Sequence, residues 1–386
     1  MMKLFFKQSP ISAFRLRRHH LIDQNRSDIV SVCRNVCGIQ AQVMSAAEIQ
    51  LWARVHSLSR ADIHTALWED RTLVKTSCMR GTLHLLPVAH LHIYITALKR
   101  SRIREMLRIM SRHGGVTPKE ADRVTEAVVE ALSAGLMTRR ELTERILSLK
   151  ITGDRAKIWF EEGWWGVTRQ AIVEGLICYG PDRGNEVTLV RVDQWLPKQK
   201  EVSELEAQQI MLRQYLSAYG PATFRDFSRW TGIPMKEVKP IWESLENEMV
   251  EVSTEDKKGA ILRKDYDELL NISPGDQTLR LLPHFDPFML GHAEKDHLVD
   301  PGSYKRVYRN AGWISPVVLL NGRAIGTWSY KRRAKLLSFE IEPFEKFSKA
   351  IRTGIEEEAD GLGSFLETSW EIKFGKVITQ SKKNIY

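Results

Sequence analysis

Two glutamines, Gln40 and Gln42, lie two residues apart in the segment Gly38-Ile-Gln-Ala-Gln42 and are the first candidates for chemistry. A glutamine oxygen accepts a hydrogen bond from water while its NH2 group donates elsewhere, so a pair can hold water without acting as a strong base. Residues two apart on a helix point about 200° apart. The pair can therefore serve one site only if the backbone between Gly38 and Val43 is irregular, which Gly38 permits. The alternative is that both amides cap backbone groups at a helix start.

Length and composition indicate a soluble globular protein. A chain of 386 residues predicts roughly two to four domains, and 43% hydrophobic residues is ordinary for such a chain. No apolar run approaches the ~18 residues of a membrane span, and the apolar start is too short for a signal peptide. We therefore expect a cytoplasmic protein. The cysteines form no CxxC pair and are interpreted as core thiols rather than metal ligands or disulfides: Cys33, Cys37, Cys78 and Cys178.

The net charge of +9 is unevenly distributed. Residues 1–150 carry +11 (24 basic against 13 acidic side chains), residues 151–300 carry −8 (18 against 26), and residues 301–386 carry +6 (15 against 9). Two basic ends around an acidic middle favour binding of a polyanion such as nucleic acid. Solvated basic surfaces without a partner are the alternative.

Residues 1–114 show the element order of a winged helix. Ser59 followed by Asp62 is a helix-start signal. The expected elements are helices over 28–37, 46–56 and 61–68, then extended runs over 72–79 and 82–87. Arg80, at the joint between these runs, is a candidate phosphate contact, with good turn composition as the alternative. His84 is interpreted as a packing histidine rather than an acid or base.

Two further winged helices are expected, over 115–200 and 201–266. The first has a capping box at Thr138 and Glu141, a Trp-rich helical stretch through Leu176 and a strand over 187–192. Its pair Trp164-Trp165 is interpreted as core rather than as a wedge between base pairs. The other has helices over 208–219, 224–230 and 235–246, then strands within 249–263. The last of these helices has an acidic bias, which favours a scaffold role over base reading: Lys236, Glu237, Lys239, Glu243 and Glu246.

Residues 267–386 are expected to form a β-rich domain. Strands are predicted over 279–286, 316–320 and 324–328, with a helix near 343–359, and Asn321-Gly322 predicts a type I′ hairpin. Basic residues at and after this hairpin are candidate DNA contacts, either in a groove or on phosphate, with a solvated surface as the alternative: Arg323, Lys331, Arg332, Arg333 and the neighbouring Lys335.

Six segments in order resemble the AlkZ/YcaQ-like family of DNA glycosylases. They are Gly38-Ile-Gln-Ala-Gln42, Leu51-Trp-Ala-Arg54, Met79-Arg-Gly-Thr-Leu-His84, Tyr219-Gly-Pro-Ala222 with Trp230, Leu281-Leu-Pro with Phe285-Asp286, and Asn321-Gly-Arg with Gly326-Thr-Trp328. The resemblance covers nearly the whole chain. It implies an α+β fold in which tandem winged-helix (helix-turn-helix) domains and a C-terminal β-rich domain form a C shape around a basic channel.

The resemblance also implies a function. Gln40 and Gln42 would be the catalytic pair of a monofunctional glycosylase that releases cationic alkylated purines, with unhooking of interstrand crosslinks in some members. Such a purine leaves as a neutral molecule without a protonating acid, so a held water molecule suffices. We expect Gln42 to hold this water and Gln40 to orient it or contact the sugar, although the two roles are not firmly assigned. No metal or other cofactor is implied, and the expected partner of the monomer is double-stranded DNA containing alkylated bases, with no membrane.

A different class of protein, a winged-helix transcription regulator that binds DNA without catalysis, is the second hypothesis. A purely structural partner-binding protein is a distant third. A regulator has no need for two amides on an irregular segment, and it should bind DNA sequence-specifically. Signatures of other enzymes are absent from the sequence, including a Walker-type phosphate loop, a dinucleotide-binding glycine pattern, HExxH and the deaminase cysteine pair.

Overall fold

The chain forms two compact units in this computed structural model, which describes residues 4–5, 8–22, 28–149, 168–253, 257–273, 277–333 and 336–375. The first unit comprises Met1–Ile63, Arg213–Trp230 and Leu245–Tyr386, and the second comprises His64–Leu212 and Thr231–Ser244. Helices and strands are mixed in both units, so the fold class is α+β, as expected. The four-part division at residues 114, 200 and 266 stays a prediction.

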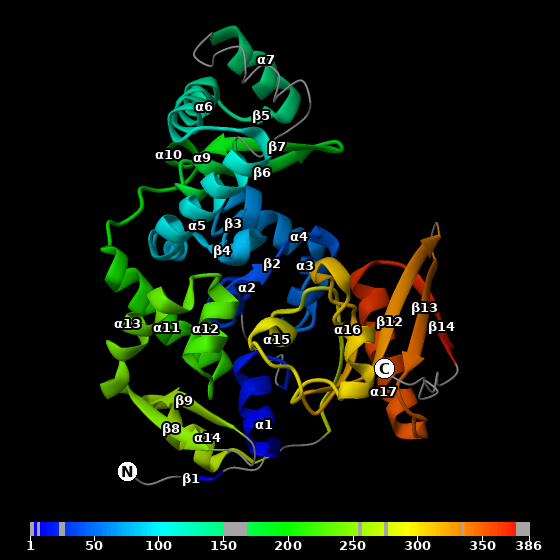
Figure 1. The fold of residues 1–386 in the computed structure, drawn as a ribbon. Coiled ribbons are helices and arrows are strands. Elements are labelled where there is room, and N and C mark those ends of the chain that lie inside the picture. Colours follow the sequence, from blue (N-terminus) through cyan, green and yellow to red (C-terminus); the bar gives the residue numbers. More distant parts are fainter. Residues whose placement is uncertain are drawn as a thin grey trace, which may run out of the picture. The chain divides into compact units, whose positions relative to one another are not determined.

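The first unit contains two sheets (Figure 1). The smaller has the order β1-β8-β9, formed by Leu4–Phe5, Met249–Ser253 and Lys258–Leu262. The larger has the order β10-β11-β12-β13-β14, formed by Leu279–Leu282, Val317–Leu320, Arg323–Arg333, Leu336–Pro343 and Ser369–Phe374. Only β13 and β14 of this sheet pair in parallel, and α17 (Lys349–Phe365) makes the connection between them. A parallel pair requires such a long crossover.

Nine further described α-helices have residues in the first unit. They are α1 (Gln8–Arg18), α2 (Ile29–Asn35), α3 (Met44–Trp52), α4 (Arg60–His64), α11 (Glu204–Tyr219), α12 (Phe224–Thr231), α14 (Tyr266–Asn271), α15 (Pro287–Leu290) and α16 (Tyr304–Val307). Apolar residues of α1 pack on β8, β9 and α14. A second cluster joins the end of α3, through Ala53, to β10, α15 and β11. This cluster fixes the segment before α3 to the C-terminal sheet.

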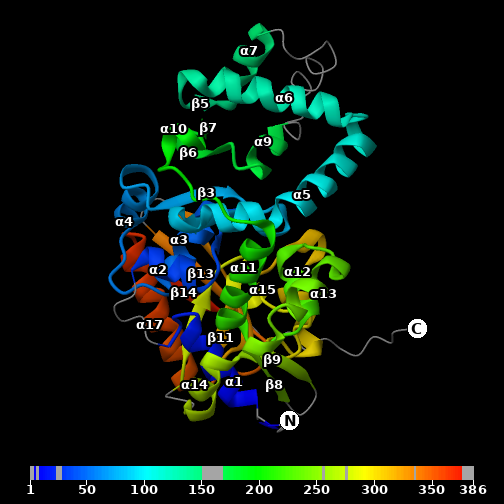
Figure 2. The ribbon, with the colours of Figure 1, turned by 90° about the vertical axis from the view of Figure 1, so that its left-hand side faces the viewer.

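The second unit contains the strands β4, β3, β6, β7 and β5 as neighbours in that order. Figure 2 labels β3, β6, β7 and β5. Their ranges are Leu83–Pro87, Leu73–Ser77, Ile177–Arg183, Glu186–Arg191 and Met137–Thr138. Its helices are α5 (Leu91–Gly114), α6 (Pro118–Ala131), α7 (Arg139–Leu149), α9 (Arg169–Val173), α10 (Val192–Trp195) and α13 (Met235–Glu243). Apolar faces of α5, α6, α7 and α9 pack with residues of β6 and β7.

Several local predictions are confirmed. The Ser59 backbone N–H donates to the Asp62 carboxylate at 2.8 Å, and the Asp62 N–H donates to the Ser59 hydroxyl at 3.2 Å. Thr138 and Glu141 form the same reciprocal pair at the start of α7. At the hairpin between β11 and β12, Asn321 has φ 48° and Gly322 has φ 85°, as a type I′ turn requires. Local side-chain chemistry thus determines these element boundaries.

Other element boundaries were predicted wrongly. The strand expected over 279–286 ends at Leu282, since Pro283 has no N–H to donate to a neighbouring strand. The helix expected over 343–359 begins instead after its N-cap Ser348, whose hydroxyl accepts the Ile351 N–H, because Pro343 ends β13. In contrast, the helices expected over 46–56 and 61–68 are both present. The first is α3, and the second is α4, which continues as a π-helix over Thr65–Glu69.

Six strands of the described residues were missed: β1, β2 (Ile39–Gln40), β5, β6, β13 and β14. The described part of the predicted Trp-rich helical stretch, residues 168–176, contains the helix α9. Trp164, Trp165 and Lys335 lie outside the described residues. Among the described residues, no helix is long and apolar enough to cross a membrane.

Candidate active site at the glutamine segment

The backbone around Gln40 and Gln42 is irregular, as the hypothesis of a shared site requires. Cys37 and Gly38 both have positive φ, 62° and 97°, and the chain then forms the short strand β2 (Ile39–Gln40). A bend follows before α3 begins at Met44. Since an L residue at positive φ is uncommon, the turn at Cys37 and Gly38 is a specific feature of this segment.

The two glutamines lie in different environments. Gln40 is buried, with 5% of its surface exposed, whereas Gln42 is exposed. Of the two side chains, Gln42 is therefore the one in contact with bulk water. The buried Gln40 contributes a backbone acceptor, because its carbonyl receives a hydrogen bond from the side chain of Gln50.

Gln50 connects the glutamine segment to the start of the C-terminal sheet. Its Nε2 donates at 3.1 Å to the carbonyl of Gln40 and at 3.1 Å to the carbonyl of His284. One side-chain nitrogen therefore binds both carbonyl oxygens and holds the two backbone segments close together. The Gln50 side chain is fully buried, which makes this bridge a rigid link rather than a surface contact.

A buried ion pair lies next to this bridge. The Arg54 guanidinium donates to both carboxylate oxygens of Asp286, at 2.8 Å and 2.7 Å, and neither side chain is exposed. Arg54 also donates to the carbonyl of Gln50 at 2.8 Å, and Asp286 caps α15 by accepting the Phe288 N–H. This pair was not predicted from the sequence. The sequence feature that could have indicated it is a single charged residue at the end of each of two apolar segments, Leu51-Trp-Ala-Arg54 and Phe285-Asp286.

Arg80, the predicted phosphate contact of the second unit, lies at the tip of the β3–β4 hairpin with φ 54°. It is half-buried, and a Cβ on Gly232 would lie 3.4 Å from the Arg80 Cα. The turn that precedes α13 therefore packs closely on this tip. A phosphate contact from Arg80 stays a prediction.

Arg323 is held by the loop that precedes it in the sequence. Its guanidinium donates to the carbonyls of Asp296 at 3.1 Å and His297 at 3.2 Å, and it forms an ion pair with Asp300. These contacts give Arg323 a structural role at the start of β12. Its predicted contact with DNA stays a prediction.

The basic residues Lys331, Arg332 and Arg333 form the end of β12 and are all exposed. They do not share one face, because neighbouring side chains of a strand point to opposite sides. Arg332 pairs across the hairpin with the buried Leu337, whereas Lys331 pairs with Ser338. Lys331 and Arg333 thus point to one side and Arg332 to the other. The sequence predicted the charge of this hairpin but not its division between two faces.

His84 is buried, and burial lowers its pKa to about 3. Its Nδ1 lies 3.0 Å from the carbonyl of Thr82. At neutral pH it is uncharged, which agrees with the packing role expected. All four cysteines lie among the described residues, where they are buried and form no disulfide. Among the described residues, no group of three or more His, Cys, Asp or Glu side chains could hold a metal ion.

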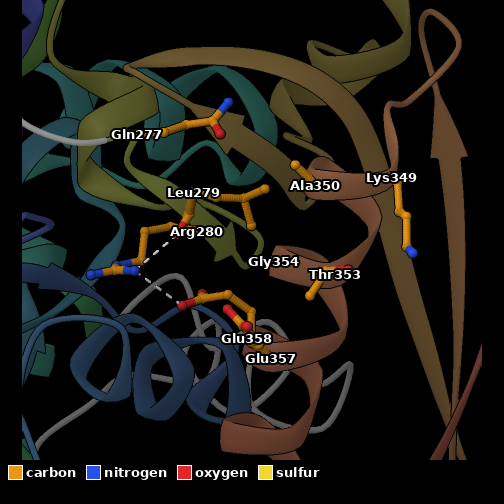
Figure 3. A pocket seen from close by; sticks show the side chains of 9 residues that line it. All are labelled: Gln277, Leu279, Arg280, Lys349, Ala350, Thr353, Gly354, Glu357 and Glu358. Carbon is orange, nitrogen blue, oxygen red and sulfur yellow. Dashed lines mark hydrogen bonds and ion pairs between the residues drawn. The ribbon is translucent and has the colours of Figure 1, made fainter.

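A pocket of about 580 Å³ lies between β10 and α17 (Figure 3). Arg280 and Glu358 form an ion pair at 3.2 Å at its edge, and Glu358 also accepts the Leu281 N–H at 2.9 Å. Burial raises the pKa of the Glu358 carboxyl, against the opposing effect of Arg280. These contacts attach α17 to β10, so we assign this pair to the architecture of the sheet.

Two comparisons give the class of protein that this fold and site define. The chain is 31% identical over 368 residues to the "Interstrand DNA cross-link repair glycosylase" of Streptomyces sahachiroi, spanning 93% of this chain and 95% of that protein. The solved structure of Streptomyces sahachiroi DNA glycosylase AlkZ superposes with a TM-score of 0.85 at 29% identity, covering 97% of this chain and 100% of that one. Both relatives are DNA glycosylases.

A family model narrows the class further. The model described as DNA glycosylase AlkZ-like matches residues 33–365, which include the glutamine segment, the Arg54–Asp286 pair and the basic hairpin. The chain belongs to the AlkZ-like DNA glycosylase family. The resemblance found in the sequence is thereby confirmed.

Proposed function

We propose that this protein hydrolyses the N-glycosidic bond of cationic alkylated purines in double-stranded DNA, including those of interstrand crosslinks. The observation that carries the proposal is the position of Gln42: an exposed amide on an irregular segment that a buried hydrogen-bond network fixes in place. Its oxygen is suited to accept a hydrogen bond from the attacking water. The name of the 31% identical relative supports the extension to crosslinks.

The burial of Gln40 supports different roles for the two glutamines. A side chain with 5% exposure is suited to hold the segment in place, whereas Gln42 can meet solvent and substrate. We therefore assign the water to Gln42 and a positioning role to Gln40. No charged base takes part, since an alkylated purine that carries a positive charge leaves as a neutral molecule. A weak base also spares neutral purines, whose departure needs more assistance.

The element order supports a winged-helix mode of DNA binding. The succession α11, α12, α13, β8 and β9 is that of a helix-turn-helix with a wing, and the hairpin β3–β4 follows the helices α2, α3 and α4. The acidic side chain of Glu237 in α13 pairs with Arg104 of α5. This pairing supports a scaffold role for α13, while the basic residues of 1–150 and 301–386 would hold the phosphates.

The test is excision of 7-methylguanine from a duplex, followed by alkali and detection of strand breaks. We expect breaks only after alkali, as for a glycosylase without lyase activity. Gln42→Ala should lower the single-turnover rate by about 100-fold, the scale typical of a lost water-activating group. Gln277→Ala, which removes another exposed glutamine of the first unit, is the matched control and should excise normally.

Gln42→Glu sharpens the test, since a carboxylate is a stronger base than an amide. We expect this variant to retain excision and to begin releasing neutral purines. If Gln42→Ala excises at the wild-type rate, Gln42 does not hold the water. Sequence-specific binding without any excision would instead support a transcription regulator.

A further inference from the structure

A small loop of the first unit presents an exposed tryptophan. The loop is closed by the Arg309 N–H, which donates to the Trp313 carbonyl at 2.8 Å, and by an isolated bridge between Tyr308 and Ile314. Ala311 and Gly312 make its turn with φ 55° and 77°. The loop is thus a defined hairpin-like turn. Trp313 is 48% exposed, an unusual position for so large an apolar side chain.

The indole of Trp313 is nevertheless fixed by two neighbouring rings. Its centroid lies 5.5 Å from that of His284, with the rings nearly perpendicular at 83°, and 5.1 Å from that of Phe285. The Nδ1 of His284 is 2.8 Å from the Ile314 carbonyl, which requires the proton on Nδ1 and makes Nε2 an acceptor in the neutral ring. The aromatic ring is therefore positioned before any ligand arrives.

The rings of His284 and Trp313 border a pocket of about 370 Å³, which is also lined by Arg309, Asn310, Ile314 and Ser315. The lining combines one large aromatic ring with side chains that can form hydrogen bonds, as sites for flat polar ligands usually do. A nucleobase is such a ligand.

The same pocket is connected to the glutamine segment. Gln50 Nε2 bridges the carbonyls of Gln40 and His284, so the residue that supports Trp313 also lies beside the segment that carries Gln42. Phe285, between His284 and Asp286, has φ 60°. For a bulky residue this conformation is strained, and it persists only where the surroundings hold it. Here the Gln50 side chain binds the carbonyl of His284, the residue before Phe285, and Arg54 binds the side chain of Asp286, the residue after it.

We propose that the His284–Trp313 pocket receives the alkylated purine of the damaged nucleotide and selects it by its positive charge; this inference rests on the proposed function. The face of an indole attracts cations, and the attraction is stronger where the contact excludes water. A neutral purine stacks on the same ring without that attraction. Asn310 can donate to or accept from the base edge, and Arg309 at the loop is suited to a flanking phosphate.

The experiment measures binding separately from excision. The probe is a duplex with one 7-methylguanine on a 2′-fluorinated sugar, a substitution that slows cleavage, compared with the same duplex carrying guanine. We expect Trp313→Ala to reduce the preference for the lesion about tenfold while its affinity for the unmodified duplex stays within twofold. Trp313→Phe should retain part of the preference. Tyr304→Ala, which removes another exposed aromatic ring of the first unit, is the control and should change neither value.

The outcomes separate the pocket from the catalytic proposal. If Trp313→Ala keeps the full preference, or if the wild-type protein shows none, the pocket does not select the base. If Trp313→Ala weakens binding to both duplexes equally, the indole contacts DNA generally and the inference is also wrong. A third result is also informative: the wild-type protein prefers the lesion, Trp313→Ala abolishes the preference, and no base is released from the normal sugar. In that case the pocket selects the base, but the proposed function is wrong.

Discussion

The charges beside the glutamine segment and the charges at the end of the β12–β13 hairpin belong to the same unit but differ in burial. Arg54 and Asp286 are completely buried and balance each other's charge, whereas Lys331, Arg332 and Arg333 are exposed. A buried pair stabilises one geometry and is unavailable to a ligand. Exposed cations contribute little to folding but can meet a polyanion. The comparison separates a charge pair that fixes the backbone beside the glutamine segment from charges that are candidates for DNA binding.

The largest effect is expected from breaking the buried pair. Asp286→Asn leaves the Arg54 guanidinium buried without its counter-ion, and we expect a loss of about 3–5 kcal/mol in the free energy of unfolding. Urea unfolding measures it. The matched control is Glu248→Gln, which breaks the pair between Arg213 and Glu248 at 2.7 Å on the surface and should cost less than about 1 kcal/mol.

A double variant strengthens this test. Arg54→Met combined with Asp286→Leu removes both charges and should be less destabilising than Asp286→Asn alone, because no unpaired charge remains. Equal losses for Asp286→Asn and Glu248→Gln would show that burial of the pair has no special consequence.

The sequence predicted the parts of the fold that short-range chemistry determines. The capping boxes at Ser59 and Thr138 and the Asn321-Gly322 turn follow from hydrogen bonds and φ angles within a few residues. In contrast, β14 pairs in parallel with β13 across the helix α17, so its position depends on a crossover that local periodicity does not encode.

The candidate site shows the same limit. Gln40 and Gln42 were identifiable as side chains, and Gly38 indicated the irregular backbone. The links that position them were not identifiable, because Gln50 and His284 are separated by more than 200 residues and meet only in the folded chain. The exposure of Trp313 likewise depends on the turn at Ala311 and Gly312, and a tryptophan in an unaligned sequence is more often a core residue.

The second expected effect concerns pH and distinguishes the buried region from the hairpin. His19 is buried between the rings of Tyr219 at 4.8 Å and Phe288 at 5.3 Å. Burial first, and then the charge of Arg54, hold the pKa of His19 well below 6.5. The unfolded chain takes up a proton below pH 6.5 that the folded chain does not. The stability associated with neutral His19 is therefore fully present above pH 6.5 and is lost as the pH falls below it.

Urea unfolding of the wild-type protein and of His19→Leu at pH 7, 6 and 5 measures this effect. The difference in stability between the two proteins should shift in favour of the variant by up to about 1.4 kcal/mol for each unit of pH below 6.5. Parallel pH profiles would mean that His19 gains a proton in the folded state. Variants of the hairpin cations should follow the wild-type profile, since those groups do not titrate in this range.

The smallest effect is expected at the hairpin and should appear in binding rather than in stability. Replacing Lys331 and Arg333, which point to one side, removes two candidate phosphate contacts, and the slope of log affinity against log salt should fall by about 1.8. Arg332 points to the other side, and Arg332→Ala should lower the slope by at most about half as much. Unfolding free energies should stay within about 0.5 kcal/mol of the wild-type value.

The control is the double variant Lys236→Ala and Lys239→Ala in the acidic helix α13, which should leave the salt dependence of binding unchanged. If the control lowers the slope as much as the hairpin variants do, α13 also contacts DNA phosphates. If the hairpin variants leave the slope unchanged, the hairpin cations face solvent and do not contact DNA.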